Sequence, residues 1–264
     1  MSSNSVTQIT LGVIDLSFHR VTASLVRHVL IDMGFTVERI YSSPKDCVSR
    51  LNKGCIDLLC SVWLPSSHGG YQSAIAEQVS ITELGLHYAP YCFWGVPDYV
   101  PKSAVKEISD LLKPDVIAKM NSTIPGIHPE ADITRLSIKM MKEYGLRDAG
   151  YHFFPGTEDC FSVVERAISN KTWIVVPLWQ PQFLHHKYPI RELTEPKGLL
   201  GTVERAVLLI RDDKKAYFTF DQLQRLDELR FSNNIIAALD YQICREGKSL
   251  DLVTKVWLKD NEYV

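Results

Sequence analysis

The sequence lacks the features that mark several large classes of protein. No apolar run among its 264 residues approaches the roughly 20 that a membrane-spanning helix needs. Lysine and arginine number 29 against 31 acidic residues and form no long basic block, so nothing predicts binding to nucleic acid or to an anionic membrane surface. The common phosphate-binding, serine-hydrolase and zinc-protease motifs are absent too. Evidence for catalysis is therefore weak.

Cysteine is scarce, and its spacing is uninformative. The six cysteines form no CxxC pair and no zinc-type pattern, and several lie in apolar runs where cysteine acts as a small hydrophobe. We therefore expect no disulfide, no metal site and no cofactor, and a reducing compartment. The first residues, MSSNSVTQITLGVIDL, lack the basic and long apolar regions of a secretory signal. These features predict a cytoplasmic location; the alternative is a periplasmic or extracellular one, if a signal was removed.

Strand and helix patterns alternate over the first 62 residues. Apolar residues recur at helical spacing from Arg20 to Met33, and Gly34 stands where a helix commonly ends. A second helix is predicted over Lys45–Asn52, with strands before, between and after the two, the last over Cys55–Val62. This order predicts an α/β fold with a parallel sheet.

The remainder of the chain continues the mixture. A stretch rich in proline and aromatics, residues 87–103, is interpreted as a strand that crosses between two lobes. Further strands are predicted over residues 151–156, 172–179 and 204–211, and helices over residues 105–112, 132–144, 159–170, 221–230, 233–245 and 249–260.

Aromatic residues gather where predicted strands end. They are Phe18 and His19, Trp63, Trp94 in the crossing stretch, and Trp179. In open α/β sheets ligands bind beyond the carboxyl ends of the strands, and several rings there would attract a methylated cation. The alternative is that each ring caps the hydrophobic core. For Trp63 and Trp179, each followed by proline two residues later, both interpretations stay open.

Polar candidates are few. His185 and His186 are adjacent, and neighbours on a helix diverge by about 100°, so we expect solvated surface rather than a metal site. Glu130 and Asp132 precede a predicted helix, where Asp132 is expected to cap the first turn. Acid–base catalysis by these carboxylates is the alternative.

Three stretches resemble one known family. Residues 63–68, WLPSSH, look like the WLPTTH-type loop of the glycine betaine-binding proteins of ABC importers. Residues 126–133, GIHPEADI, are similar to the family's G-I-D-P-G-A-G-I segment, and residues 173–183, WIVVPLWQPQF, to its W-I-V-V-T-x-W-T-P-H-W segment. The likeness continues through Lys187, Tyr188, Leu193 and residues 195–198, EPKG, and so covers almost the whole chain in order.

The resemblance implies an α/β fold of the two-lobed type II periplasmic-binding-protein class, each lobe a mixed sheet flanked by helices. Lobe 1 would hold residues 1–90 plus 192–264, and lobe 2 residues 91–191. The ligand would lie in an aromatic-lined cleft that closes by a hinge.

The resemblance also implies roles for single residues. Trp63 and Trp179 fall on cage tryptophans, and His68 on a histidine that contacts the ligand's carboxylate. The backbone N–H groups of Asp132 and Ile133 fall where relatives offer helix N-terminal amides to that carboxylate. A cage tryptophan that some relatives place after the first strand is absent, and Phe18 is its expected substitute.

Two family glycines are replaced by Glu130 and Asp132. Carboxylates at this helix start would repel a carboxylate on the ligand. The hypothesis is therefore an amine ligand without a carboxylate, or one that donates hydrogen bonds to Glu130 or Asp132. We expect a monomeric, non-catalytic binding protein whose partners are this small amine and an ABC permease. The alternatives are an enzyme that uses Glu130, Asp132 or His68 as acid or base, and a ligand-gated regulatory protein.

Overall fold

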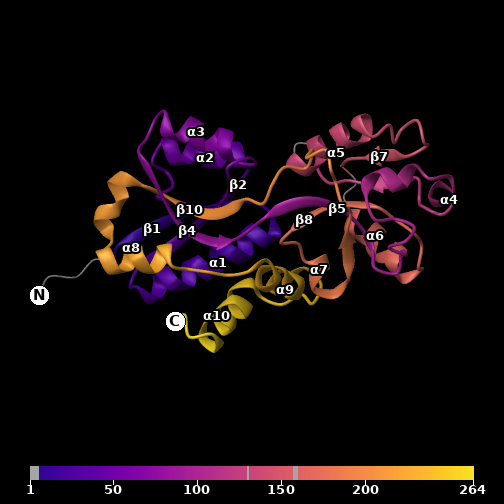
Figure 1. Ribbon diagram of the computed structural model, residues 1–264. Coiled ribbons are helices and arrows are strands. Elements are labelled where there is room, and N and C mark those ends of the chain that lie inside the picture. Colours follow the sequence, from indigo (N-terminus) through magenta and orange to yellow (C-terminus); the bar gives the residue numbers. More distant parts are fainter. Residues whose placement is uncertain (1–5, 130, 157–159) are drawn as a thin grey trace, which may run out of the picture. The chain divides into compact units, whose positions relative to one another are not determined.

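The computed structural model describes residues 6–129, 131–156 and 160–264 (Figure 1). The chain forms two compact units, each with its own sheet. Unit 1 consists of residues 1–90, 181–183 and 204–264, and unit 2 of residues 91–180 and 184–203.

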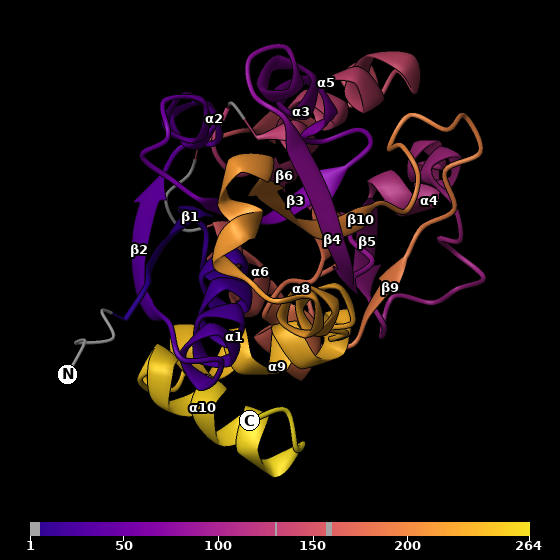
Figure 2. The same ribbon diagram turned by 90° about the vertical axis from the view of Figure 1, so that its left-hand side faces the viewer.

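Unit 1 is built on a five-stranded sheet in the order β2-β1-β3-β10-β4 (Figure 2). β1 runs parallel to β2 and β3, which confirms the parallel sheet predicted from the alternating pattern. β10 is antiparallel to both of its neighbours. The strands are β1 (Gln8–Ile14), β2 (Thr36–Ser42), β3 (Leu58–Leu64), β4 (Ile81–Tyr88) and β10 (Arg205–Arg211).

Helices cover both faces of this sheet. α2 and α3 lie on one face, and α1 lies on the other with α9 and α10 packed against it (Figure 2). The helices are α1 (Ser17–Asp32), α2 (Pro44–Asn52), α3 (Gly69–Ala76), α8 (Phe220–Asp227), α9 (Asn233–Cys244), α10 (Leu250–Asp260) and the 3-10 helix η2 (Asp212–Tyr217). α1 begins three residues earlier than predicted, which places Phe18 and His19 in its first turn.

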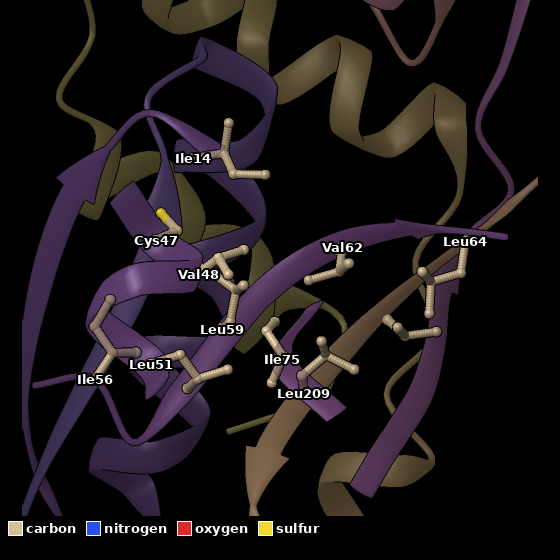
Figure 3. Close-up of a cluster of buried hydrophobic side chains, with 11 residues drawn as sticks. Ile14, Cys47, Val48, Leu51, Ile56, Leu59, Val62, Leu64, Ile75 and Leu209 are labelled. Atoms are coloured by element: carbon tan, nitrogen blue, oxygen red, sulfur yellow. The ribbon is translucent and has the colours of Figure 1, made fainter. Parts of the chain in front are cut away.

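A cluster of buried apolar side chains fills the space between the sheet, α2 and α3 (Figure 3). α2 contributes Cys47, Val48 and Leu51, and α3 contributes Ile75. The sheet contributes Leu59, Val62 and Leu64 of β3, with Leu209 of β10. This packing explains why β3, buried on both faces, reads as a nearly continuous apolar run.

A bulge in β3 decides which way Trp63 points. Ser61 has a φ of 61°, and the pairing with β10 shifts there, so that three steps on β3 match two on β10. An extra residue reverses the alternation of faces, so Val62 and Leu64 join Leu59 toward α2 and α3. Trp63 is thereby directed to the opposite face, where α1 lies.

Unit 2 contains two smaller sheets. β5 pairs with β8 and β9 in an antiparallel three-stranded sheet, and β6 pairs in parallel with β7. The elements are β5 (Tyr91–Pro97), β6 (Thr123–Pro125), β7 (His152–Phe154), β8 (Val176–Gln180), β9 (Ile190–Glu192), α4 (Pro114–Ile117), α5 (Asp132–Glu143), α6 (Cys160–Ser169), α7 (Leu184–Lys187) and the 3-10 helix η1 (Ile108–Leu112).

Three predicted boundaries were wrong in instructive ways. The single crossing strand over residues 87–103 is two strands, because Pro90 follows the end of β4 and lacks the N–H that a ladder needs. Trp63 lies within β3 and Trp179 within β8, rather than after the strands. The helix predicted over residues 105–112 is the short 3-10 helix η1.

Two expectations from composition can be compared with the structure. Among the described residues, no helix is both long and apolar enough to cross a membrane. The six cysteines all lie in the described ranges and form no disulfide.

Candidate functional site

Four rings of unit 1 lie together and are called the ring cluster: Phe18, His19, Trp63 and His68. The Trp63 ring centre is 5.3 Å from that of Phe18, 5.5 Å from His19 and 6.2 Å from His68. Phe18, His19 and Trp63 are 3%, 2% and 7% exposed. The first turn of α1 and the bulged end of β3 thus bring together the residues singled out by sequence in this unit.

A network of hydrogen bonds fixes two of these rings. Nδ1 of His19 lies 2.8 Å from the Ser61 hydroxyl oxygen, which is 2.5 Å from the hydroxyl of Tyr88. The indole N–H of Trp63 donates to the same tyrosine oxygen at 3.0 Å. Both Ser61 and Tyr88 are buried. The orientation of His19 and of Trp63 therefore depends on one shared tyrosine in β4.

His68 is held by the backbone of Trp63. Its Nδ1 accepts the N–H of Trp63 at 2.8 Å, and its own N–H donates to the Trp63 carbonyl at 2.9 Å. Because Nδ1 is an acceptor here, the proton of the neutral imidazole is on Nε2. The loop therefore holds the His68 ring beside Trp63, and its contact with a ligand stays a prediction.

A buried carboxylate anchors the loop between Trp63 and His68. Glu204, 6% exposed, accepts the backbone N–H groups of Ser66 and Ser67, each at 2.8 Å, and the hydroxyl of Ser67. Charge-assisted bonds to backbone amides are among the stronger hydrogen bonds in proteins. Glu204 therefore fixes the path of the chain that carries His68.

The electrostatics of the ring cluster favour an uncharged imidazole at His19. Burial, together with the nearby His68, holds the pKa of His19 well below its ordinary value of 6.5. Burial also raises the pKa of Tyr88, so its hydroxyl keeps its proton at neutral pH. The cluster thus offers aromatic faces without a neighbouring positive charge on His19, which suits a cationic ligand.

In unit 2 the predicted cage residue Trp179 is 6% exposed and lies in β8 opposite Cys92 of β5. The Phe161 ring stands nearly edge-on to it, with ring centres 6.0 Å apart. The carbonyl oxygen of Trp179 lies 3.1 Å from Nε2 of His185, and the centre of the His185 ring is 5.4 Å from that of Phe93. These residues are called the Trp179 group.

The expectation that His185 is solvated surface was wrong. The α7 turn directs its ring back onto β5 and β8, and burial lowers its pKa to about 4. Only its neighbour His186 is exposed. The reason is that α7 is a single turn packed on the sheet, with Leu184 and His185 on its inner side and His186 and Lys187 exposed.

Trp94 belongs to the core of unit 2. It is fully buried in β5, and its indole N–H donates to the Ser137 hydroxyl of α5 at 3.0 Å. A fully buried ring whose N–H is hydrogen bonded is typical of core packing, the alternative to ligand binding for Trp94.

The start of α5 differs from the expected cap. Ala131 is the N-cap, and Asp132 is the first helical residue, its carboxylate paired with Arg135 one turn later. Asp132 was therefore wrongly predicted as the N-cap. No described residue accepts the backbone N–H groups of Asp132 and Ile133, so two helix N-terminal amides remain for another acceptor. Glu130 lies outside the described residues.

Three residues that hold the candidates in place were not predicted from the sequence: Ser61, Tyr88 and Glu204. Each is distant in the chain from the ring it orients or interrupts an apolar pattern without a motif. Within the described ranges, no group of three or more His, Cys, Asp or Glu side chains could hold a metal ion.

Comparison with known proteins identifies the family. Residues 7–260 match the model of the OpuAC family, described as the substrate-binding domain of ABC-type glycine betaine transport systems. The chain belongs to this family. It is also 25% identical over 154 residues to the glycine betaine/carnitine transport binding protein GbuC of Listeria monocytogenes, an alignment covering 56% of this chain. The match spans about half, 49%, of that curated relative's length.

Solved structures share the fold. The closed, glycine betaine-bound lactococcal OpuAC superposes with a TM-score of 0.79 at 23% identity, covering 97% of both chains. ProX of Borrelia burgdorferi gives 0.78 at 23% identity, covering 97% of this chain and 94% of its own. A choline-binding protein in complex with choline gives 0.75 at 18% identity over 97% and 89%. The predicted α/β periplasmic-binding-protein fold is confirmed.

Proposed function

We propose that this chain is a non-catalytic solute-binding domain that captures a small amine with a methylated cationic head. The observation that carries the proposal is the ring cluster of unit 1, in which Phe18 and Trp63 lie 5.3 Å apart beside two histidines. A cation over such rings gains about 0.5–1 kcal/mol when exposed and about 2 kcal/mol or more when desolvated.

The relatives support the same class of ligand. One is named for glycine betaine and carnitine, one structure holds glycine betaine and another holds choline. All three compounds, glycine betaine, carnitine and choline, carry a trimethylammonium group. The resemblance assigns Trp179 to the same ligand, and substitution of Trp179 tests that assignment. Family membership supports an ABC permease as the partner that receives the ligand.

The enzyme alternative finds its best support in His19 and Ser61, an imidazole nitrogen 2.8 Å from a hydroxyl. This pair is poorly arranged for nucleophilic catalysis. Ser61 is 0% exposed, and its oxygen is also bonded to Tyr88. A serine nucleophile must reach the substrate carbon. We therefore assign the pair to the positioning of the rings.

A thermal-shift screen across methylated amines and their acids tests the proposal. A ligand at about 100 times its dissociation constant should stabilise the protein by about 2.7 kcal/mol. Trp63→Ala should abolish the shift, whereas Trp257→Ala, a tryptophan of α10 packed on Phe231 and Tyr263, should keep it. No shift with any amine, or turnover of a bound amine, would overturn the proposal.

A further inference from the structure

A buried carboxylate lies beside the first turn of α1, next to the ring cluster. Asp240 of α9 is 0% exposed, and its Oδ2 accepts a hydrogen bond from the hydroxyl of Ser17 at 3.0 Å. Its Oδ1 accepts one from the thiol of Cys244, one turn further along α9, at 3.3 Å. Ser17 is the first residue of α1 and directly precedes Phe18 and His19. The carboxylate therefore joins α9 to the turn that carries two of the four rings.

Within the described ranges, no side chain forms an ion pair with this carboxylate. Of the charged groups that the structure describes, only the guanidinium of Arg245 in α9 acts on it, and that group lies over the Phe183 ring. The described part of α1 presents the Ser17 hydroxyl to it, and that of α10, the other helix packed on α9, presents no charged group. A buried charge without an ion pair costs folding free energy, so its place beside a candidate site indicates a function.

The position of this charge suits the start of α1. The N-cap residue, Leu16, makes no side-chain hydrogen bond to the first turn, and the positive end of a helix dipole attracts a negative charge. Asp240 supplies that charge from the neighbouring helix. Because a buried charge is screened little by salt, it also favours a cation bound on the adjacent rings of Phe18 and Trp63.

We propose that Asp240 is a positioning residue for the ring cluster. Its ionised carboxylate, acting through Ser17, holds the first turn of α1 in the arrangement that receives a cationic amine, and binding weakens when the carboxylate gains a proton. The inference rests on the proposed function and adds a pH dependence to it. It also gives α9 a part in a site whose rings come from α1, β3 and the loop after β3.

Protonation of Asp240 changes both of its hydrogen bonds. The ionised carboxylate has two acceptor oxygens, which match the two donors that reach it. After protonation one oxygen carries an O–H and becomes a donor, so the bond to Ser17 or to Cys244 has to reverse, and the charge-assisted strength of both is lost. Burial raises the pKa of Asp240 from an ordinary 3.8 to about 6, so the proton is gained in mild acid.

Calorimetric titration with choline at about pH 7.5 and about pH 5 tests the inference, because choline has no group that titrates in this range. If bound choline lowers the pKa of Asp240 by about one unit, choline should bind about fivefold more weakly at the lower pH. Equal or tighter binding at the lower pH overturns the role of Asp240 and leaves the proposed function standing. If choline and every other methylated amine fail to bind at either pH, both are overturned.

Variants connect the pH dependence to the residue. Asp240→Asn keeps the size of the side chain without its charge, so its affinity for choline should already be about fivefold lower at neutral pH and should change less in acid. The matched control is Asp57→Asn, since Asp57 is another buried aspartate of unit 1 but pairs with Lys214 at 3.1 Å. The control should keep the pH dependence of the unaltered protein. An Asp240→Asn protein that binds choline as tightly as the unaltered protein contradicts the inference.

Carbon NMR of the unaltered protein gives a test that does not depend on any variant folding. In protein labelled with 13C at the aspartate side-chain carboxyls, one carboxyl should titrate at about pH 6, and saturating choline should move its midpoint to lower pH. A carboxylate with a purely structural role would titrate at the same pH with and without choline. That result would overturn the inference.

Discussion

The two units hold their candidate ligand groups by different means. In unit 1 the ring cluster is tied by side-chain hydrogen bonds that join α1, β3 and β4 through Ser61 and Tyr88. In unit 2 Trp179 is fixed by strand pairing with β5 and by a histidine on its backbone carbonyl. The first arrangement depends on the identity of several side chains, whereas the second depends mainly on the path of the backbone.

This difference suggests different contributions of the two units to ligand recognition under the proposed function. A network that depends on side chains can specify donors and acceptors, so under the proposed function we expect unit 1 to select the ligand's chemistry. A ring on a paired strand supplies shape and a π surface with little chemical preference. Substitutions in unit 1 should therefore change which ligand binds, and substitutions in unit 2 how tightly any ligand binds.

The largest effect is expected from loss of a ring. Trp63→Ala should cost about 3–5 kcal/mol of folding free energy and at least about 30-fold in amine affinity, since a buried tryptophan and its cation contact are removed. Urea unfolding measures the folding free energy, and calorimetry measures the amine affinity. Trp179→Ala should weaken all amines by a similar factor, without changing their order. If Trp179→Ala changes the order of affinities among the amines, the proposed difference between the two units is wrong.

The second largest effect is expected from acid, which should lower the free energy of unfolding. Burial lowers the pKa of His87 in unit 1 and of His185 in unit 2 to about 4, from an ordinary 6.5. Below pH 6.5 the unfolded chain binds protons that the folded chain refuses, so stability is complete above that pH and falls as the pH approaches 4. For His87 the loss is on the order of 3 kcal/mol.

Variants assign the acid effect to each unit. His87→Phe should flatten the fall in unfolding free energy between pH 6.5 and 4, measured by urea titration, and His185→Phe should do so separately. In unit 1 the pKa of His19 is also lowered. Some loss of unfolding free energy below pH 6.5 should therefore remain after His87→Phe. A stability that is flat over this pH range in the unaltered protein would refute the assignment.

The third largest effect is expected from removal of the Glu204 carboxylate, which anchors the loop between Trp63 and His68. Glu204→Ala leaves the amides of Ser66 and Ser67 without their acceptor, and should cost about 1–3 kcal/mol of folding free energy. It should also weaken amine binding several-fold, because the loop carries His68. Glu77→Ala, an exposed glutamate at the end of α3, is the control and should change neither quantity. Binding that is indifferent to Glu204 would show that the loop is not part of the site.

The smallest effect is expected at the start of α5. Asp132→Gly should raise the affinity for glycine betaine by about threefold, because a negative charge leaves the helix N-terminus. The gain is limited because Arg135 already pairs with this carboxylate, and exposed pairs of this kind contribute little. Asp115→Gly, in the first turn of α4, serves as the control. A gain of a hundredfold would mean that Asp132 directly blocks a carboxylate subsite.

Much of the fold followed from local pattern, whereas the means of holding the site did not. The alternation of strands and helices predicted the parallel core of unit 1, because burial imposes periods of two and 3.6 on apolar residues. Trp63 and His68 could be singled out because both lie in one short stretch, residues 63–68, that resembles a family motif. Tyr88, 25 residues beyond Trp63, gave no signal, because its role depends on a bulge at Ser61 and on the register between strands.

The most direct test of the account is a calorimetric comparison of choline and glycine betaine on the unaltered protein. Choline offers the cationic head with an uncharged hydroxyl, while glycine betaine offers the same head with a carboxylate, which a carboxylate such as Asp132 at the start of α5 would disfavour. The account predicts that choline binds with micromolar affinity and more tightly than glycine betaine. Tight binding of glycine betaine without binding of choline would contradict it, as would the failure of both to bind.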